Sequence, residues 1–535
     1  MARQDLRAPA EDGGLLALPP LVDGLTRLEA NRRFLASWDH DFQGRRAGRL
    51  RTMVRAQVLA LSKNHLARFG LDGAPFADPS APLVVTGHQP ELSHPGVWVK
   101  NFAIASIAER CGGTALNLIV DNDLPKGASI RVPCEDDGPL RARAVDFDDW
   151  VGEVPFEDLS VRDESLFASF GDRVGKALGR LVADPLIHEF WPLALRAGER
   201  TPLTGMRFAV ARRALEGSWG VRNAEVPLSA VCESEGFLWF ASHLLAHLPR
   251  FQTLHNEALA RYRVEHGIRS RNHPVPALGS EGDWLEAPFW VWRDRSPRRR
   301  PLLARQQGEM MDLRIAGEAE TLIRIPLAPD RDACCAVRDL QGLPARGVRL
   351  RTRALTTTMF ARLLLGDVFL HGIGGAKYDE LGDEVARCFF EIEPPPFLTL
   401  SMTLRLGLDA DPEAPSRLKA LDRRLRDLTF NPDRNFAGVA RPGFLQLAEA
   451  KRRAIAAPQG DHAERVARFR HIRGLNQEMQ ADLGGMRAAL LGNRTGLTAA
   501  IQRQALARNR EYSLVLHSKA SLRRAMAQAV PGVFS

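Results

Sequence analysis

Two short apolar runs on either side of one amphipathic segment constrain this fold more than any other feature. PLVVTG at 82–87 and TALNLIVDND at 114–123 have the length and apolar content of buried strands. Between them, residues 97–113 show helical periodicity and end at a glycine pair, which is a helix stop signal. A strand, a helix and a strand in so short a segment form a βαβ unit, and such units build parallel sheets. We therefore expect an α/β protein with a parallel-sheet core.

The same pattern returns later in the chain and suggests how the chain is divided. Residues 284–306 are a tryptophan-rich hairpin candidate, and DVFLHG at 367–372 is a strand followed by a glycine-rich turn and a helix. We expect a helical segment at 1–80, the first part of the core at 81–215, an inserted connecting region at 216–320, the second part of the core at 321–410, a helical region at 411–510, and a segment returning to the core at 511–535.

The helical region at 411–510 contains two apolar seams. The second seam runs through residues 472–490, and the first consists of leucines three or four residues apart: Leu418, Leu421, Leu425 and Leu428. This spacing is typical of an antiparallel helical hairpin or a short coiled coil. The alternative is that these helices pack directly onto the core.

Composition narrows the class of protein. The chain is 45% hydrophobic and 26% charged, as folded globular proteins are. It has no apolar run long enough to span a membrane, no secretory signal core, and no C-x-x-C pair among its six cysteines. We therefore expect no membrane partner, no zinc knuckle and a cytoplasmic location.

The chain is basic, with 73 Lys and Arg against 64 Asp and Glu and a net charge of +9. A GC-rich genome also produces an arginine excess, and no basic–aromatic interleaving typical of single-strand binders is present. Nucleic acid is therefore not an expected partner. For one turn-rich cluster we expect a solvated loop or an ion network, with a phosphate or nucleic-acid contact as the alternative: Arg293, Arg295, Arg298, Arg299 and Arg300.

The loop TGHQPELSHPG at 86–96 lies where the first strand gives way to the helix. Ligands of parallel sheets bind beyond the carboxyl ends of the strands, and a helix N-terminus favours an anion. Imidazoles there stabilise charge on a transferring group. We predict a catalytic role for His88 and substrate or nucleotide binding by Gly87, Gln89, His94 and Lys100. The alternative is a proline-rich turn whose histidines cap the helix.

The loop HGIGGAKYDE at 371–380 repeats this arrangement after the later strand. We predict a catalytic role for His371, which should face the same cavity as His88. Glycine-rich turns between strand and helix accommodate phosphate or carboxylate, and Lys377 would supply charge and open the next helix together with Asp379. The predicted binding residues of this flexible turn are Gly372, Gly374, Gly375 and Lys377.

Two carboxylates, Asp121 and Asp123, follow the second strand. We predict a catalytic role for both, because paired carboxylates at a strand end can bind an amine, hold Mg²⁺ or act as a base. The alternative is that they form an ordinary turn. ATP or another nucleotide with Mg²⁺ is a candidate cofactor, and no metal site built from protein ligands alone is expected.

Three of these stretches, in this order and spacing, resemble the bacillithiol-biosynthesis cysteine-adding enzyme family. In that family a strand ending in acidic residues is similar to LIVDND, and an LRP segment, a helix and AYVGGPGE look like residues 350–380. The family also has a TGQQ-x-GL…GP turn that leads into a helix with an early lysine. TGHQPELSHPGVWVK keeps six of its positions: Thr86, Gly87, Gln89, Leu92, Pro95 and Lys100.

The resemblance implies a Rossmann-like core related to nucleotidylyltransferases and class I synthetases, with inserted connecting elements, a helical coiled coil and a homodimer formed through it. It also implies a ligase or transferase that adds cysteine to a glucosaminyl-malate amine. The chain departs from the family at His88, at Glu91 and around Lys377, within the expected pocket.

These departures lead us to expect an enzyme that joins an amino acid or small carboxylate to an amine or hydroxyl acceptor, on a small-molecule substrate that can differ from glucosaminyl-malate. Two alternatives remain open. One is an enzyme of the nucleotidylyltransferase type. The other is a non-catalytic nucleotide- or ligand-binding assembly protein.

Overall fold

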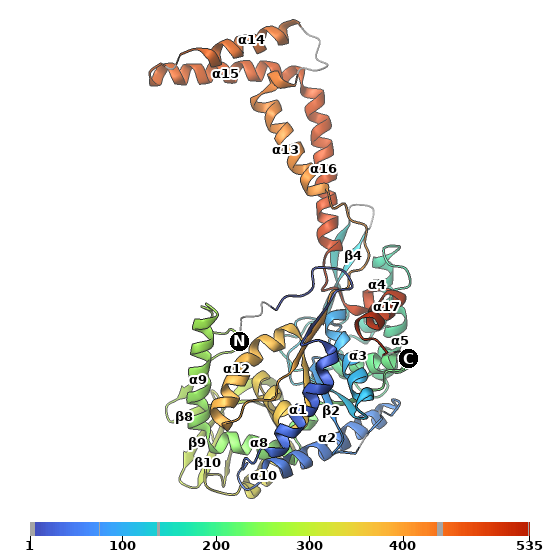
Figure 1. Cartoon of the computed structure of the whole chain (residues 1–535), viewed down its shortest axis with the longest axis vertical. Coiled ribbons are helices and arrows are strands. Elements are labelled where there is room, and N and C mark those ends of the chain that lie inside the picture. Colours follow the sequence, from blue (N-terminus) through green and yellow to red (C-terminus); the bar gives the residue numbers. More distant parts are fainter. Residues whose placement is uncertain are drawn as a thin grey trace.

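A computed structural model of the chain describes residues 6–73, 75–76, 78–135, 140–435, 442–458, 460–532 and 534. Helices and strands together form a body, and a bent helical arm projects from it (Figure 1). Within these ranges, no helix is both long enough and apolar enough to cross a membrane.

The main sheet of the body has six strands, and five of them run parallel, which confirms the expected mixed α/β fold with a parallel sheet. The sixth strand is antiparallel and comes from the N-terminal segment, which was expected to be mostly helical. Across the sheet the strands are β1 (Leu15–Leu18), β14 (Leu398–Met402), β13 (Val368–His371), β2 (Leu83–His88), β3 (Thr114–Ile119) and β6 (Ala224–Pro227).

Strand β2 lies in the middle of this sheet and is buried on both faces, which explains its continuous apolar sequence. Leu83 and Val85 point into one hydrophobic core, and Val84 points into the other. The helix that follows, α3 (Pro95–Arg110), contacts β2, β3 and β14. The expected βαβ unit is therefore present, and its loop lies at the carboxyl edge of the sheet.

Helices cover both faces of the main sheet (Figure 1). The core that contains α3 also receives residues of α1 (Gly24–Ser37), α4 (Glu164–Leu178), α5 (Ile187–Gly198), α6 (Thr204–Ser218) and α17 (Lys519–Ala529). The other core receives residues of α2 (Ala47–Phe69), α7 (Leu228–Cys232), α8 (Glu235–Ala246), α9 (Leu248–Glu265), α10 (Cys334–Gln341), α11 (Ala354–Phe360) and α12 (Ile373–Phe390).

A second, antiparallel sheet lies beside the main sheet and contains the expected tryptophan-rich hairpin. Its strands are β7 (Ser280–Glu281), β8 (Trp284–Arg293), β9 (Ser296–Gln307), β10 (Met310–Ile315), β11 (Ile323–Ile325) and β12 (Val348–Thr352). A separate two-stranded ribbon pairs β4 (Ser129–Cys134) with β5 (Arg141–Asp146).

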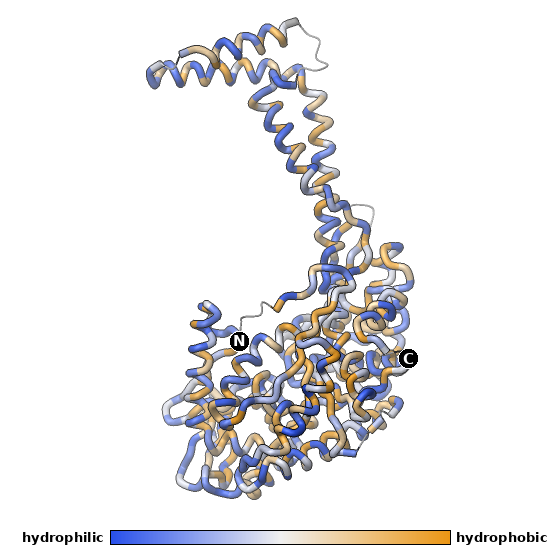
Figure 2. Tube along the Cα trace, in the orientation of Figure 1, coloured by the Kyte–Doolittle hydropathy of each residue, from blue (hydrophilic) through white to orange (hydrophobic). Residues whose placement is uncertain are grey.

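Four helices form the arm, with a small core of their own. They are α13 (Ala414–Phe430), α14 (Pro442–Ala456), α15 (His462–Asp482) and α16 (Gly484–Ala507). Helix α13 packs against α16, and α14 packs against α15, so the arm has two limbs that meet at a bend (Figure 1). The arm helices project from the body and do not pack along it (Figure 1). In keeping with this exposed position, apolar residues alternate with polar ones along these helices, whereas the body contains denser apolar segments (Figure 2).

The chain returns to the body after the arm. The amide of Leu514 donates to the carbonyl of Ser93, within the first predicted loop, at 2.8 Å. Helix α17 then contacts α3. The C-terminal residues thus support the helix that follows β2.

Candidate functional site

A cavity of about 550 Å³ lies at the carboxyl ends of β2, β3 and β13. This is the edge at which open α/β sheets bind ligands, and the volume is in the range of small-molecule sites. Segments far apart in the sequence therefore meet here. The predicted site residues along its wall are Gly87, His88, Gln89, Lys100, Asp123, His371, Gly372, Gly374 and Gly375.

His371 is the last residue of β13 and is held by a carboxylate from the next helix. Its Nε2 atom lies 2.8 Å from Oδ2 of Asp379. Arg362 donates to the same oxygen and Thr358 donates to Oδ1, both at 2.6 Å. Burial lowers the pKa of His371 despite the opposing effect of Asp379. Burial alone would raise the pKa of Asp379, but Arg362 and His371 outweigh it and hold that pKa below its usual value. The arrangement favours a neutral imidazole that donates from Nε2.

The second ring nitrogen of His371 faces a glycine. Within the described residues, Nδ1 has no hydrogen-bond partner, and a Cβ atom on Gly375 would lie 2.7 Å from it. A Cβ atom on Gly374 would meet nothing within 4 Å. Both glycines belong to the first turn of α12 and do not form the flexible turn that we expected. Gly375 therefore leaves space beside the one nitrogen that can accept a proton.

Lys100 reaches the cavity wall from α3, and its ammonium group has only one hydrogen-bond acceptor and no ion-pair partner among the described residues. Its Nζ atom donates to the carbonyl of Gly87 at 3.0 Å. No described carboxylate forms an ion pair with it, and burial lowers its pKa to about 8. A buried amine without a counter-ion is costly, and an anionic group in the cavity would offset that cost.

The opposite wall comes from the second sheet, and sequence reasoning missed it. Arg299 lies 2.9 Å from Oδ1 of Asp123, whose other oxygen accepts from Gln89 at 2.8 Å. The guanidinium carbons of Arg299 and Arg353 lie 5.3 and 4.1 Å from the ring centroid of Trp290. In the sequence, Arg299 differs from its arginine neighbours only by its register on β9. It is part of an ion network, one of the two roles first expected for the cluster.

His88 lines the cavity, but its ring nitrogens are both engaged with the protein. Nδ1 lies 3.1 Å from the carbonyl of Gln89, and Nε2 lies 3.2 Å from Oδ1 of Asn101. The side-chain amide of Asn101 donates to Glu216, which also accepts from Arg212. Burial, with the nearby charges, lowers the pKa of His88 well below its usual value. Both partners are acceptor oxygens and a neutral imidazole has one N–H, so only one of the two contacts is a hydrogen bond. Each ring nitrogen nevertheless faces a protein atom, and these contacts position the loop.

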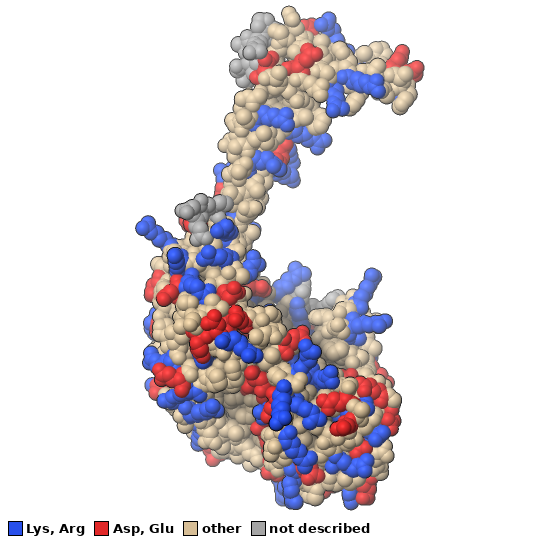
Figure 3. Space-filling model, turned by 180° about the vertical axis from the view of Figure 1, so that it is seen from behind, with Lys and Arg blue, Asp and Glu red and all other residues tan. Residues whose placement is uncertain are grey.

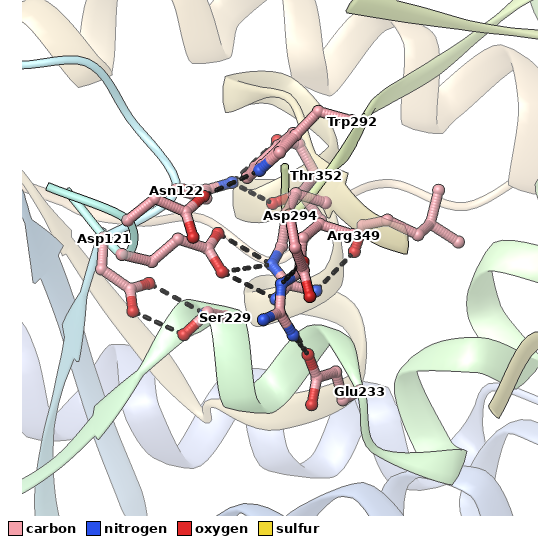
Figure 4. A network of polar contacts seen from close by, with 12 residues as sticks. Asp121, Asn122, Ser229, Glu233, Trp292, Asp294, Arg349 and Thr352 are labelled. Atoms are coloured by element: carbon pink, nitrogen blue, oxygen red, sulfur yellow. Dashed lines mark hydrogen bonds and ion pairs between the residues drawn. The ribbon is translucent and has the colours of Figure 1, made fainter. Parts of the chain in front are cut away.

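Asp121 belongs to a polar network between the two sheets (Figure 4). Asp121 does not line the cavity, although Asn122 and Thr352 of the same network do. Its two oxygens accept from the amide and the hydroxyl of Ser229, at 2.9 and 2.5 Å. In the same network, Arg351 lies 2.7 Å from Glu157 and 2.9 Å from Glu233. Asp121 thus joins the segment after β3 to α7, and its carboxylate does not face the cavity for which we predicted its catalytic role.

Two other predicted residues also lie apart from the cavity wall. His94 caps α3, where its Nδ1 accepts from the amide of Gly96 at 3.1 Å, as the alternative interpretation held. Lys377 is exposed in α12, and its carbonyl accepts from Tyr262. Its charge therefore does not enter the site.

The donor set does not match a Mg²⁺ site formed by protein carboxylates. Asp121 and Asp123 each accept hydrogen bonds with both oxygens, and Asp123 is also paired with Arg299. No group of three or more His, Cys, Asp or Glu side chains in the described ranges has metal-binding geometry. We therefore derive no chemical step through a metal.

No family model matches the chain, and no curated protein is significantly similar to it. The fold and the cavity define a mixed α/β protein with a candidate site at the carboxyl edge of its parallel sheet.

Proposed function

We propose that this chain is an enzyme, a ligase or transferase related to the bacillithiol cysteine-adding family, with a Rossmann-like core and a coiled-coil arm. It joins an amino acid or small carboxylate to an amine or hydroxyl acceptor. One observation carries this proposal. A carboxylate-held imidazole with a free nitrogen, His371, shares a cavity with a buried amine that has no counter-ion, Lys100.

His371 is suited to act as a general base. A neutral imidazole that donates Nε2–H to Asp379 has its lone pair on Nδ1, beside Gly375. Nδ1 can take a proton from an amine or hydroxyl acceptor as that group attacks a carbonyl carbon. Asp379 then stabilises the imidazolium that forms. The orientation of the ring is fixed before the substrate arrives, because Asp379 is itself held by Arg362 and Thr358.

Lys100 is suited to bind the negative charge of the donor. Joining a free carboxylate to an amine releases water and is unfavourable, so the donor needs an activated form such as an acyl phosphate or a nucleotide ester. Its leaving group departs as an anion and carries the electron pair of the broken bond. The buried ammonium of Lys100 supplies compensating charge in surroundings where electrostatic effects are strong.

The alternatives have less support. A nucleotidylyltransferase-type enzyme would use the histidine of the first loop on its ligand, but both nitrogens of His88 contact the protein. A non-catalytic binding protein would not need the free Nδ1 of His371.

Dimerisation through the arm remains part of the proposal, supported by exposed apolar side chains at Leu445, Ile455 and Phe469.

The test combines ligand stabilisation with product detection. Amino acids, small carboxylates, phosphates and nucleotides are screened by thermal shift, since a ligand at 100 times its Kd stabilises a protein by about 2.7 kcal/mol. Ligands that stabilise the protein are then incubated with amine and hydroxyl acceptors, with and without ATP, and condensation products are sought by mass spectrometry. We expect a product that the His371→Gln variant does not form. Ligand binding with no product from any combination would favour the binding protein instead.

A further inference from the structure

The arm carries the whole net charge of the protein. Residues 414–507, from the start of α13 to the end of α16, contain 17 Lys and Arg and 8 Asp and Glu, a difference of +9. The remaining residues contain 56 of each kind and are neutral overall. An arginine excess imposed by genome composition would be spread along the chain. This excess is confined to one structural unit.

Many of these cations have no partner within the arm. Of the arm cations, Arg494 pairs with Asp422 and Lys451 pairs with Asp433. Arg417 and Arg503 pair with Asp411 and Glu135, which lie outside the arm. The exposed arm cations that form no ion pair with a described residue include Lys419, Arg423, Arg424, Arg426, Arg470 and Arg473. Unpaired charges at this density repel one another and favour an anionic partner.

The basic side chains are ordered along the helices. Lys419, Arg423 and Arg426 follow the i, i+4, i+7 spacing of one face of α13. At about 1.5 Å per residue, successive charges in this row are about 4–6 Å apart along the helix axis. A row of this kind suits a linear series of negative groups better than a single small ion.

The basic surface lies mainly on the concave side of the arm, where the distal limb turns over the body (Figure 3). The space under the bend also borders the side of the body that carries α9 (Figure 1). A flat lipid surface cannot enter a concave space. A second copy placed with its arm against this concave face would bring the same positive charge, so the arm dimer proposed above would use another face of the arm. A polyanion of limited width satisfies both the shape and the charge.

We propose that the concave face of the arm binds the phosphate backbone of a folded RNA. Arginine forks match phosphate geometry, and phosphate contacts of this kind need no base-specific residues. Duplex DNA is straight at this scale, because its persistence length is about 50 nm, so it would contact only one limb of the bend. A folded RNA can follow both limbs. The proposal replaces our expectation, based on overall composition, that nucleic acid is not a partner. Overall composition does not show that the excess positive charge is confined to the arm.

The test is fluorescence anisotropy of the full chain with a labelled RNA hairpin, a labelled DNA duplex of equal length, and anionic vesicles, at several salt concentrations. The arm variant replaces Lys419, Arg423 and Arg426 by Ala, which keeps the helix propensity high. The control variant replaces three exposed arginines of the body, Arg180, Arg295 and Arg298, by Ala. Circular dichroism checks that both variants are folded.

We expect the arm variant to lose at least tenfold in RNA affinity and about 3 in the slope of log K against log salt, about one unit per phosphate contact. The control variant should bind as the unchanged protein does. The proposal fails if RNA does not bind at about 50 mM salt, if both variants weaken equally, or if DNA or vesicles bind more tightly than the RNA.

Discussion

The Nε2 atom of His371 lies 2.8 Å from Oδ2 of Asp379, in a pair formed by the end of β13 and the second turn of α12. The carboxylate is charged, because Arg362 contacts the same oxygen. The pair therefore fixes both the tautomer and the direction of the imidazole, and its functional consequences can be measured.

Asp379→Asn should lower kcat by about 10³-fold or more with little change in KM, because the ring loses the charge that stabilises its protonated form. Turnover needs neutral His371, and burial lowers its pKa below 6.5, so the rate should remain high somewhat below pH 6.5 and fall only as the ring becomes protonated. In the variant the raising effect of Asp379 is lost, so the acidic limb should move to lower pH. A kcat–pH profile measures both effects.

The control for this variant is Thr358→Val, which removes one hydrogen bond to Asp379 but leaves its charge in place. Its profile should keep the original midpoint. If the profiles of Asp379→Asn and the unchanged protein coincide, His371 is not the base.

Gly375→Ala should abolish most turnover and cost some stability, because the buried ring of His371 has to shift to make room for the methyl group. The added methyl would lie 2.7 Å from Nδ1 of His371 and so block the access of a substrate proton. Alanine also favours the helix by roughly 0.5–1 kcal/mol relative to glycine, which works against a loss of stability. The matched control is Gly374→Ala, which meets nothing within 4 Å. Steady-state rates and melting curves of the two variants separate the effects, and equal rates would contradict the assignment.

Lys100→Met should weaken the binding of an anionic substrate by about 10²-fold while raising stability, because it removes a buried charge that has no ion-pair partner. Burial lowers the pKa of Lys100 to about 8, so anion affinity in the unchanged protein should decline above pH 8 as the amine loses its proton. The folded-state pKa is below that of the unfolded chain, so this group makes the protein more stable as pH rises from about 8 to 10.5.

Calorimetric titration at pH 7 and pH 9 measures the affinity of the Lys100→Met variant, and urea unfolding measures its stability. A variant that binds the anion as tightly as the unchanged protein at both pH values would show that Lys100 does not contact the substrate.

Arg351→Met should reduce the free energy of unfolding by about 3–5 kcal/mol, because Glu157 would be left buried without its partner. At acidic pH, Glu157 can take up a proton in the folded variant, so the deficit should be smaller at pH 5 than at pH 8. The comparison is Arg295→Met, an exposed arginine for which we expect a change within about 0.5 kcal/mol. Urea unfolding at the two pH values measures both variants.

The sequence predicted the edge of the sheet at which the site lies, because β2 and β13 have apolar runs that end in histidine and glycine. It also paired the two loops correctly around one cavity. It did not show which histidine is free, because the ring contacts of His88 depend on Asn101, which is a buried part of α3. That arrangement follows from packing, which a short motif does not encode.

The far wall of the site could not be predicted from local pattern. Trp290 and Arg299 reach the cavity because β8 and β9 form a hairpin whose sheet lies against the parallel one. Asp379 was noted only as an opener of the helix after the glycine turn. Its contact with His371 exists because α12 begins earlier, at Ile373, so that a residue in its second turn faces back to the strand end.

Strand β1 pairs with β14 and completes the outer edge of the main sheet. These two strands are neighbours in the sheet, but almost all of the body's sequence lies between them in the chain. A ribosome adds about 5–20 residues per second, so roughly 20–80 s elapse between synthesis of the first strand and arrival of its neighbour. For that period the segment Leu15–Leu18 lacks the strand with which it will pair, β14. Its unpaired backbone N–H and C=O groups are then accessible to chaperones and to other chains.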